Sequence, residues 1–240
     1  MLNTVRGSLV LALGIALAGW WVGQGFQKGR AADRYVTVKG ISERDVQADI
    51  AVWPLRFVAS DNDLAKAQAR IESGGAAIMA FLDRNGISPE AAEIQGFEVN
   101  DLLANPYRSG PIESRYIISQ TVLVRSDRPE DIRTLSQKVG ELVDAGVVLT
   151  GGGGPTPGPT YLFTRLNDVK PEMIAEATAN ARTAAQQFAK DSGSKLGGIR
   201  QANQGVFVIL PRDQAPGTME ELQIHKTVRV VTTVEYYLED

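Results

Sequence analysis

The side chains that most often perform catalysis are scarce in this sequence, which has one histidine, His225, and no cysteine. Without cysteine the chain forms no disulfide, offers no thiolate and has no cysteine ligand for a metal. A Ser-His-Asp triad would have to use His225, and no Gly-x-Ser-x-Gly motif precedes a predicted helix. His225 falls inside the last predicted strand, on its more polar face. We therefore interpret it as a solvated or hydrogen-bonded strand residue rather than a catalyst.

Acidic side chains gather at three places, which are Glu43/Asp45/Asp49, Asp61/Asp63 and Glu220/Glu221. The Asp61/Asp63 pair is predicted to cap a helix, and the other two groups flank strands. None has the alternating oxygen ligands of an EF-hand loop, so solvated faces are the favoured interpretation. An enzyme with an unrecognised carboxylate site, for example Asp49 with a partner on a neighbouring strand, is kept as a third hypothesis.

The glycine run Gly151–Gly154 does not have the form of a phosphate-binding loop. Such a loop ends in Gly-Lys-Ser/Thr and opens a helix, whereas this run continues as Pro-Thr-Pro-Gly-Pro. We predict a hinge or loop there. The sequence thus predicts no catalytic, cofactor-binding or metal-binding residue, and a protein that needs no cofactor and is not an enzyme.

The composition is that of a folded domain with an unremarkable surface. The chain has 240 residues, of which 43% are hydrophobic and 22% charged, and its formal net charge is −3. A net negative charge gives nucleic-acid binding no electrostatic basis. The absence of cysteine is compatible with an oxidising compartment.

The first 26 residues are predicted to be a transmembrane helix or signal anchor. Residues 8–22 read SLVLALGIALAGWWV, and the uncharged run continues to Phe26. About 20 apolar residues suffice to cross a bilayer, and paired tryptophans are typical of its interface. Ala16-Leu17-Ala18 resembles a signal cleavage site, so cleavage is the alternative, but the apolar run continues past it. Gly19 and Gly23 have a GxxxG spacing, which we ascribe to the general abundance of glycine in membrane spans.

The charges around this segment leave its orientation open. Arg6 precedes it, whereas Lys28, Arg30 and Arg34 follow it. By the positive-inside rule this count mildly favours a body in the cytoplasm, in conflict with the signal-like start. A cytoplasm-facing membrane scaffold is therefore one alternative.

Alternating and helical patterns predict the elements of the remaining chain, after a tether over 27–34. We expect strands at 35–40, 46–59, 94–100, 115–125, 147–149, 161–166, 205–210 and 224–238. We expect helices at 62–85, from 127 through 142, and from Pro171 to Ser192. Residues 41–45 are polar and are predicted to be a turn. Because Pro54 cannot donate to a strand ladder, its strand should lie at an edge or be bulged.

The same order of elements occurs twice. Residues 62–125 and 171–238 each contain a long helix, a glycine stop, a strand, a proline-containing loop and a long alternating strand. This is a similarity of plan rather than a sequence repeat. It predicts an α+β fold of mainly antiparallel sheets with long strands packed on alanine-rich helices, over 35–240, with two sub-regions at about 35–126 and 127–240. Strand length beyond the covering helix is available for pairing with another subunit.

Two segments resemble the signatures of SIMPL-domain proteins. The first, at 35–57, reads YVTVKGISERDVQADIAVWPLRF; Gly40 and Ala51 fit the pattern, but Gln47-Ala48-Asp49 stands where the family usually has Pro-Asp. The second, at 172–199, reads EMIAEATANARTAAQQFAKDSGSKLGGI, an alanine-rich helix running into a Gly-Lys-Leu-Gly-like turn. The similarity covers about residues 35–238.

The resemblance implies a bacterial protein of unknown function, secreted to the periplasm or associated with the membrane. It carries over no site residues. It also implies self-assembly into rings through the sheets and a link to oxidative-stress tolerance. We therefore expect a single-pass inner-membrane protein with a periplasmic, homo-oligomeric body, bound to the lipid bilayer through its N-terminal helix. The second hypothesis is an envelope binding module for a small ligand or an unfolded client, which would need a concave apolar pocket between sheet and helices.

Overall fold

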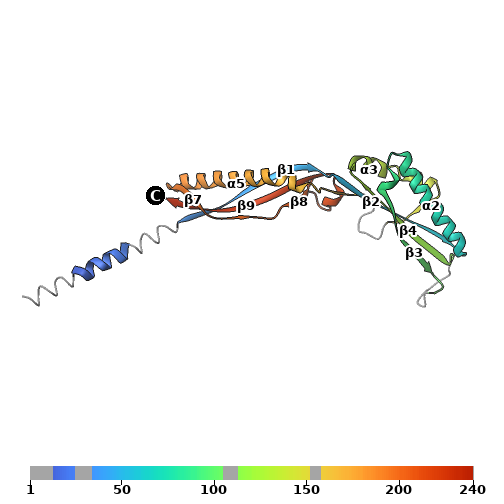
Figure 1. Cartoon of the computed structure of the whole chain (residues 1–240), viewed down its shortest axis with the longest axis horizontal. Coiled ribbons are helices and arrows are strands. Elements are labelled where there is room, and N and C mark those ends of the chain that lie inside the picture. Colours follow the sequence, from blue (N-terminus) through green and yellow to red (C-terminus); the bar gives the residue numbers. More distant parts are fainter. Residues whose placement is uncertain (1–12, 25–33, 105–112, 152–157, 240) are drawn as a thin grey trace, which may run out of the picture. The chain divides into compact units, whose positions relative to one another are not determined.

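The computed structural model describes residues 13–24, 34–104, 113–151 and 158–239 (Figure 1). The order of its elements is β1 (Tyr35–Gln47), β2 (Ile50–Asp61), α2 (Leu64–Arg84), β3 (Ala92–Asp101), β4 (Tyr116–Ser126), α3 (Pro129–Ser136), α4 (Gly140–Asp144), β5 (Val148–Leu149), β6 (Thr160–Leu162), α5 (Leu166–Asp191), β7 (Lys195–Gln204), β8 (Val208–Pro211) and β9 (His225–Glu239). Short 3-10 turns lie at Pro89–Ala91 and Glu220–Leu222. The predicted α+β class with antiparallel sheets is confirmed.

Contacts divide the chain into two compact units that are interleaved in sequence. The first unit contains Met1–Arg44, Val169–Val208 and Arg229–Asp240, and the second contains Asp45–Asp168 and Ile209–Val228. Our sequence-based sub-regions, divided at about residue 126, are a different partition, because they follow the chain and not its contacts.

One sheet has the strand order β1-β9-β7, with β8 also paired to β9. Strand β7 and most of β1 and β9 belong to the first unit. Strand β1 alternates buried and exposed residues, and Val38, Gly40 and Ser42 lie on its buried side. That side faces α5, whose buried residues are mostly alanine: Met173, Ala177, Ala181, Ala185 and Ala189. A Cβ on Gly40 would collide with the Ala177 carbonyl oxygen and lie 2.5 Å from the Ala181 nitrogen, so small residues here let backbone meet backbone.

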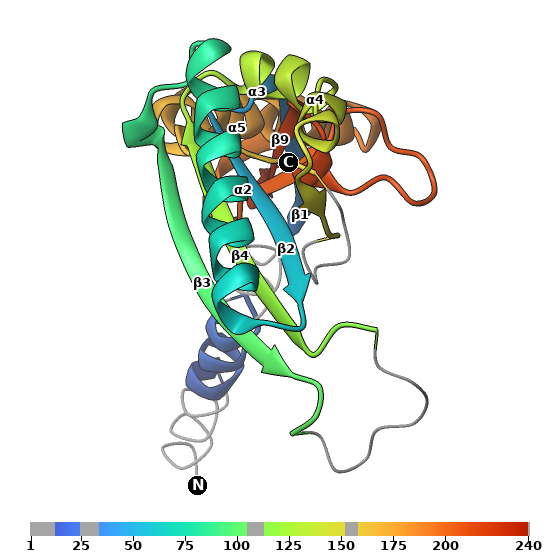
Figure 2. The same cartoon turned by 90° about the vertical axis from the view of Figure 1, so that its right-hand side faces the viewer.

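The sheet of the second unit has the order β3-β4-β2, with β5 and β6 both on the outer edge of β2. Helix α2 lies across this sheet (Figure 2). Buried side chains of β2, α2 and β4 form the core between them, including Trp53, Leu55, Phe57, Ile71, Ile78, Phe81, Ile118 and Val122. The N-terminus of α2 is capped by Asp63, which accepts from Ala65 N at 2.9 Å, as predicted from the sequence.

The two sheets follow one plan. In each, the strand after the long helix lies at the edge (β3 or β7), and the next long strand is central (β4 or β9). The other neighbour of the central strand is β2 in one sheet, which directly precedes α2, and β1 in the other, which comes first in the chain. The similarity of plan that the sequence indicated is therefore present in the strand order.

Several predicted elements differ from the observed ones. The expected turn at 41–45 is part of β1, and the expected helix from 127 is two helices, α3 and α4. Helix α5 begins at Leu166, not at Pro171, and residues 195–204, which we expected to hold a turn, form β7. The predicted loop at 151–159 lies mostly outside the described residues.

Residues 13–24 are helical, in agreement with part of the predicted N-terminal segment. Residues 1–12 and 25–33 lie outside the described residues. Within the described ranges, no helix combines the length and the hydropathy needed to cross a bilayer. The membrane span of residues 1–26 stays a prediction.

Candidate functional site

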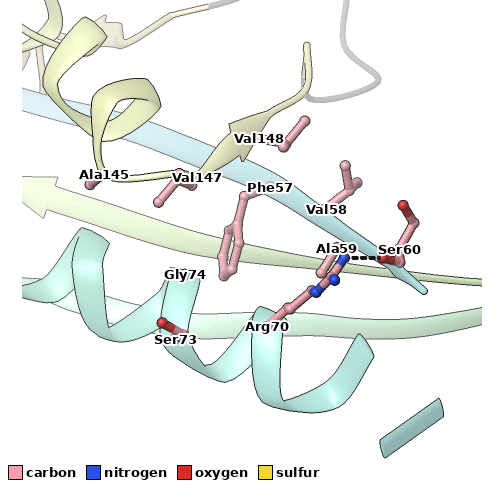
Figure 3. Close-up of a pocket in the computed structure, with 11 residues that line it drawn as sticks. Phe57, Val58, Ala59, Ser60, Arg70, Ser73, Gly74, Ala145, Val147 and Val148 are labelled. Carbon is pink, nitrogen blue, oxygen red and sulfur yellow. Dashed lines mark hydrogen bonds between the residues drawn. The ribbon is translucent and has the colours of Figure 1, made fainter. Parts of the chain in front are cut away.

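A cavity of about 440 Å³ lies beside the end of β2 (Figure 3). Three segments form its walls: Phe57–Ser60 of β2, the side of α2 carrying Arg70, Ser73 and Gly74, and the turn Ala145–Val148 that leads into β5. Its volume falls within the range of small-molecule and peptide pockets. This is the concave space between sheet and helix that the binding hypothesis requires.

Two local features of the sequence create this space. The ring of Phe57 lies against Gly74, where an added Cβ would be 3.2 Å from it, so glycine lets the ring and helix approach closely. Gly146 has a φ of 83°, a left-handed conformation that favours glycine. Two hydrogen bonds hold this turn against the end of α4: Gly146 N donates to Val143 O and Val147 N donates to Leu142 O, both at 2.9 Å.

Among the described residues that line the cavity, Arg70 is the one with a charged side chain. Its guanidinium donates to the Ser60 carbonyl at 2.9 Å and pairs with Asp61 at 3.1 Å (Figure 3). The backbone N–H of Asp63, together with Arg70, lowers the pKa of Asp61. The lowered pKa keeps Asp61 ionised at neutral pH, and the wall offers a hydrogen-bonding surface rather than a general acid or base.

A second hollow, of about 320 Å³, contains the single histidine of the sequence. His225 is exposed at the first position of β9, and the hollow is also lined by Tyr161, Glu130 and Arg133. Burial raises the pKa of Tyr161, and Glu130 adds to the effect although Arg133 opposes it. The phenol is therefore protonated at neutral pH. Arg133 pairs with Glu130 at 2.9 Å, so the hollow presents no activated nucleophile.

Asp49, the carboxylate singled out for a possible acid site, is engaged by a neighbouring loop. Its two oxygens accept from Thr164 N at 2.6 Å and from Thr164 Oγ1 at 2.5 Å. Partial burial would raise its pKa, but these hydrogen bonds outweigh burial and lower it. Over the described parts of the chain, no three His, Cys, Asp or Glu residues are arranged to hold a metal ion.

Polar partners also contact three of the other acidic residues that the sequence analysis noted. Asp45 accepts from Thr227 Oγ1 at 2.8 Å, and Glu43 pairs with Arg229 at 3.1 Å. Glu220 pairs with the fully buried Lys226. The first two contacts join strands β1 and β9, which are distant in sequence, and the third connects the turn at Glu220–Leu222 to β9.

Strand β3 presents an apolar edge that α2 leaves uncovered. Ile94, Phe97 and Val99 are 53%, 56% and 45% exposed. Ile94 pairs across the ladder with Val122, and Val99 with Ile118, two residues of the core. Partners that lie opposite each other in a ladder share a face, so this edge continues the core's apolar surface into solvent.

Sequence reasoning located β3 but missed the cavity. The signal that could have found it is the pair Gly74-Gly75 in the middle of a predicted helix, since an interior glycine often has a packing reason. The cavity also depends on β5 beginning at Val148, and no local sequence pattern specifies that boundary.

Comparison with protein families matches residues 36–236 to a family described as "SIMPL: Protein of unknown function (DUF541)". No curated protein matches the chain.

Proposed function

The chain belongs to the SIMPL family of proteins of unknown function, and we propose that it is a non-enzymatic, membrane-anchored protein whose periplasmic body self-associates. Strand β3 of one copy pairs with β3 of another in antiparallel orientation. Such an assembly would act in the envelope or in oxidative-stress tolerance, the roles that the family resemblance suggests.

The observation that carries self-association is the apolar row Ile94, Phe97 and Val99 on an edge strand. Proteins usually protect edge strands with charges, bulges or cover, because an open edge pairs with other chains. Strand β3 has a register shift between Gln95 and Glu98, next to Gly96, and carries Glu93 and Glu98, but its apolar row remains exposed despite these features. Since the three side chains are about half exposed, burying them in a dimer contributes on the order of 2–4 kcal/mol.

Membrane anchoring is supported by the helix over residues 13–24. Its large apolar side chains are exposed, among them Leu13 at 63%, Trp20 at 68% and Trp21 at 77%. Water solvates such a surface poorly, whereas a bilayer buries it and places tryptophans at its interface. The signal-like start of the sequence and the family resemblance support a body outside the cytoplasm.

The site chemistry supports a non-enzymatic role. His225 is exposed, Tyr161 has a raised pKa, and Asp49 is held by Thr164.

Self-association is tested by measuring the mass of the full-length protein in detergent by analytical ultracentrifugation. We expect the unaltered chain to contain more than one copy, and Ile94→Lys to shift it to the monomer, because lysine at an edge opposes pairing. Val143→Lys, at a residue of α4 that is 59% exposed, should leave the mass unchanged. A monomeric unaltered chain at all concentrations would refute this part of the proposal.

The cavity beside β2 favours a second candidate function, an envelope module that binds a ligand or client. Phe57, Gly74 and Val147 give it an apolar interior, and Ser60, Ser73 and Arg70 supply polar groups. Apolar walls with a few fixed polar groups are the usual composition of binding pockets.

A further inference from the structure

We infer that the cavity beside β2 binds an extended, mostly apolar peptide segment. The segment adds as a short strand to the outer edge of β2 past Val58, where the pairing with β5 ends. This inference rests on the second candidate function and is independent of self-association through β3. The ligand class is thus an unfolded polypeptide and not a small apolar molecule.

The outer edge of β2 is paired over only part of its length. On the inner side, β4 pairs with β2 from Ala51 to Asp61. On the outer side, β6 pairs with Ile50 to Val52 and β5 with Phe57 and Val58. Among the described strands, none pairs with the outer edge of β2 past Val58.

The direction of the backbone groups follows from one hydrogen bond. Thr150 N donates to Arg56 O at 2.9 Å, so Arg56 directs its backbone groups toward β5. In an antiparallel ladder every second residue does the same, which places the groups of Val58 and Ser60 on that edge. The chain before β5 does not reach Ser60, since Gly146 and Val147 donate back to α4.

Arg70 occupies the place that a further strand would take. Its guanidinium donates to the Ser60 carbonyl at 2.9 Å, where a peptide N–H would otherwise donate (Figure 3). The Arg70 side chain is 64% exposed, so its contacts are of the weak surface kind and it can move aside. A charged side chain over an open edge also discourages indiscriminate pairing.

The cavity next to this edge is built for side chains. A strand added to β2 would alternate its side chains between the two faces of the sheet. On the face toward α2, one of them would enter between Phe57, Gly74 and Val147. Val148 also borders the cavity and is 59% exposed; opposite Val58 in the ladder, it lies on the other face of the sheet and offers apolar contact to side chains of the segment on that face. Backbone pairing plus a side-chain pocket is the usual combination in recognition by strand addition.

The test uses the full-length protein in lipid nanodiscs and a fluorescein-labelled peptide of alternating valine and threonine with charged ends. Fluorescence anisotropy measures binding, with empty nanodiscs subtracted. A second peptide has the same side chains but N-methyl groups on alternate residues, so it cannot donate hydrogen bonds to the edge. We expect saturable binding of the first peptide and at least tenfold weaker binding of the second.

Two matched variants locate the site. Val148→Glu puts a charge beside the place of the added strand, on the face of the sheet that Val58 shares, and should weaken peptide binding at least fivefold. Val143→Glu changes a valine of α4 that is equally exposed, at 59%, and should bind as the unaltered chain does. Both positions are on the surface, and circular dichroism melting curves verify that each variant folds.

Each result decides between the alternatives. Equal binding of the two peptides, or equal loss in both variants, overturns strand addition at β2. If neither peptide binds but the apolar dye 1-anilinonaphthalene-8-sulfonate does, in a manner sensitive to Val148→Glu, the cavity binds small molecules and the peptide assignment is wrong. If nothing binds, the second candidate function fails as well.

Discussion

The carboxylate of Asp49 accepts hydrogen bonds on both oxygens, and this sets how it responds to acid. Thr164 N and Oγ1 donate to it, and the Asp49 side chain is 15% exposed. The pKa of Asp49 in the folded protein is lowered from its ordinary value of 3.8. Its contribution to stability is therefore fully present above pH 3.8 and is lost as the pH falls through the lower, folded-state pKa.

We predict that Asp49→Asn reduces the free energy of unfolding by about 1–3 kcal/mol at pH 7, because an amide nitrogen cannot accept from Thr164. Urea unfolding of both proteins across the acid range measures the difference. The difference in the free energy of unfolding between the two proteins should narrow below pH 3.8, as the unaltered Asp49 becomes protonated. A gap that is independent of pH would mean that the charge on Asp49 contributes nothing.

At the residue scale, sequence reasoning was accurate where chemistry is local. The exposed strand position of His225 and the capping role of Asp63 follow from their neighbours in sequence. The partner of Asp49 could not be predicted, since Thr164 lies 115 positions away and meets it only after the strands pair.

At the scale of elements, the backbones of β1 and α5 approach each other closely at Gly40. Gly40 faces backbone atoms of Ala177 and Ala181, which cannot rotate away as a side chain can. Any side chain at position 40 must push the helix off the sheet.

We predict that Gly40→Ala lowers the free energy of unfolding by about 1–3 kcal/mol, the usual cost of overpacking. Gly198→Ala in β7 is the control, because an added Cβ there meets nothing within 4 Å. Urea unfolding compares the two variants with the unaltered chain. Equal effects of both substitutions would show that the close approach of β1 and α5 is not needed for stability.

The element boundaries show which patterns carry information. The heptad-like apolar face of α2 and the alternation of β9 predicted both elements to within a few residues. Strand β7 was missed because KLGGIRQANQ has no apolar alternation, and its strand form comes from pairing with β9. Pro54 lies in the central part of β2 but between the stretches paired to β6 and β5, where no N–H is required of it.

The start of α5 was wrong for a related reason. Proline is tolerated in the first turn of a helix, which led to Pro171 as its beginning. The helix begins at Leu166 and includes Pro171. A proline close to an N-terminus removes one hydrogen bond to the preceding turn, a loss that packing of the alanine face on the sheet offsets.

At the scale of the whole molecule, the chain combines an apolar N-terminal helix with a body that has an exposed apolar edge strand. Each exposes large apolar side chains: Trp20 and Trp21 on the helix, and Ile94 and Phe97 on β3. In the proposed function, a bilayer covers the first surface and a second copy covers the other. The sequence led to both proposed partners, but it could not identify β3 as an edge strand, because that depends on strand order.

The most direct test of membrane-bound, extracytoplasmic self-association uses the absence of native cysteine. Phe97 lies near the middle of β3, so in an antiparallel pair of identical strands it faces its own copy. Spheroplasts expressing full-length Phe97→Cys are treated with a short, membrane-impermeant bis-maleimide, and Val143→Cys serves as the control. We predict a cross-linked dimer for Phe97→Cys and only singly labelled monomer for Val143→Cys. Labelling of Phe97→Cys without a dimer would contradict pairing through β3, and no labelling of either variant in intact spheroplasts, with labelling after lysis, would place the body in the cytoplasm.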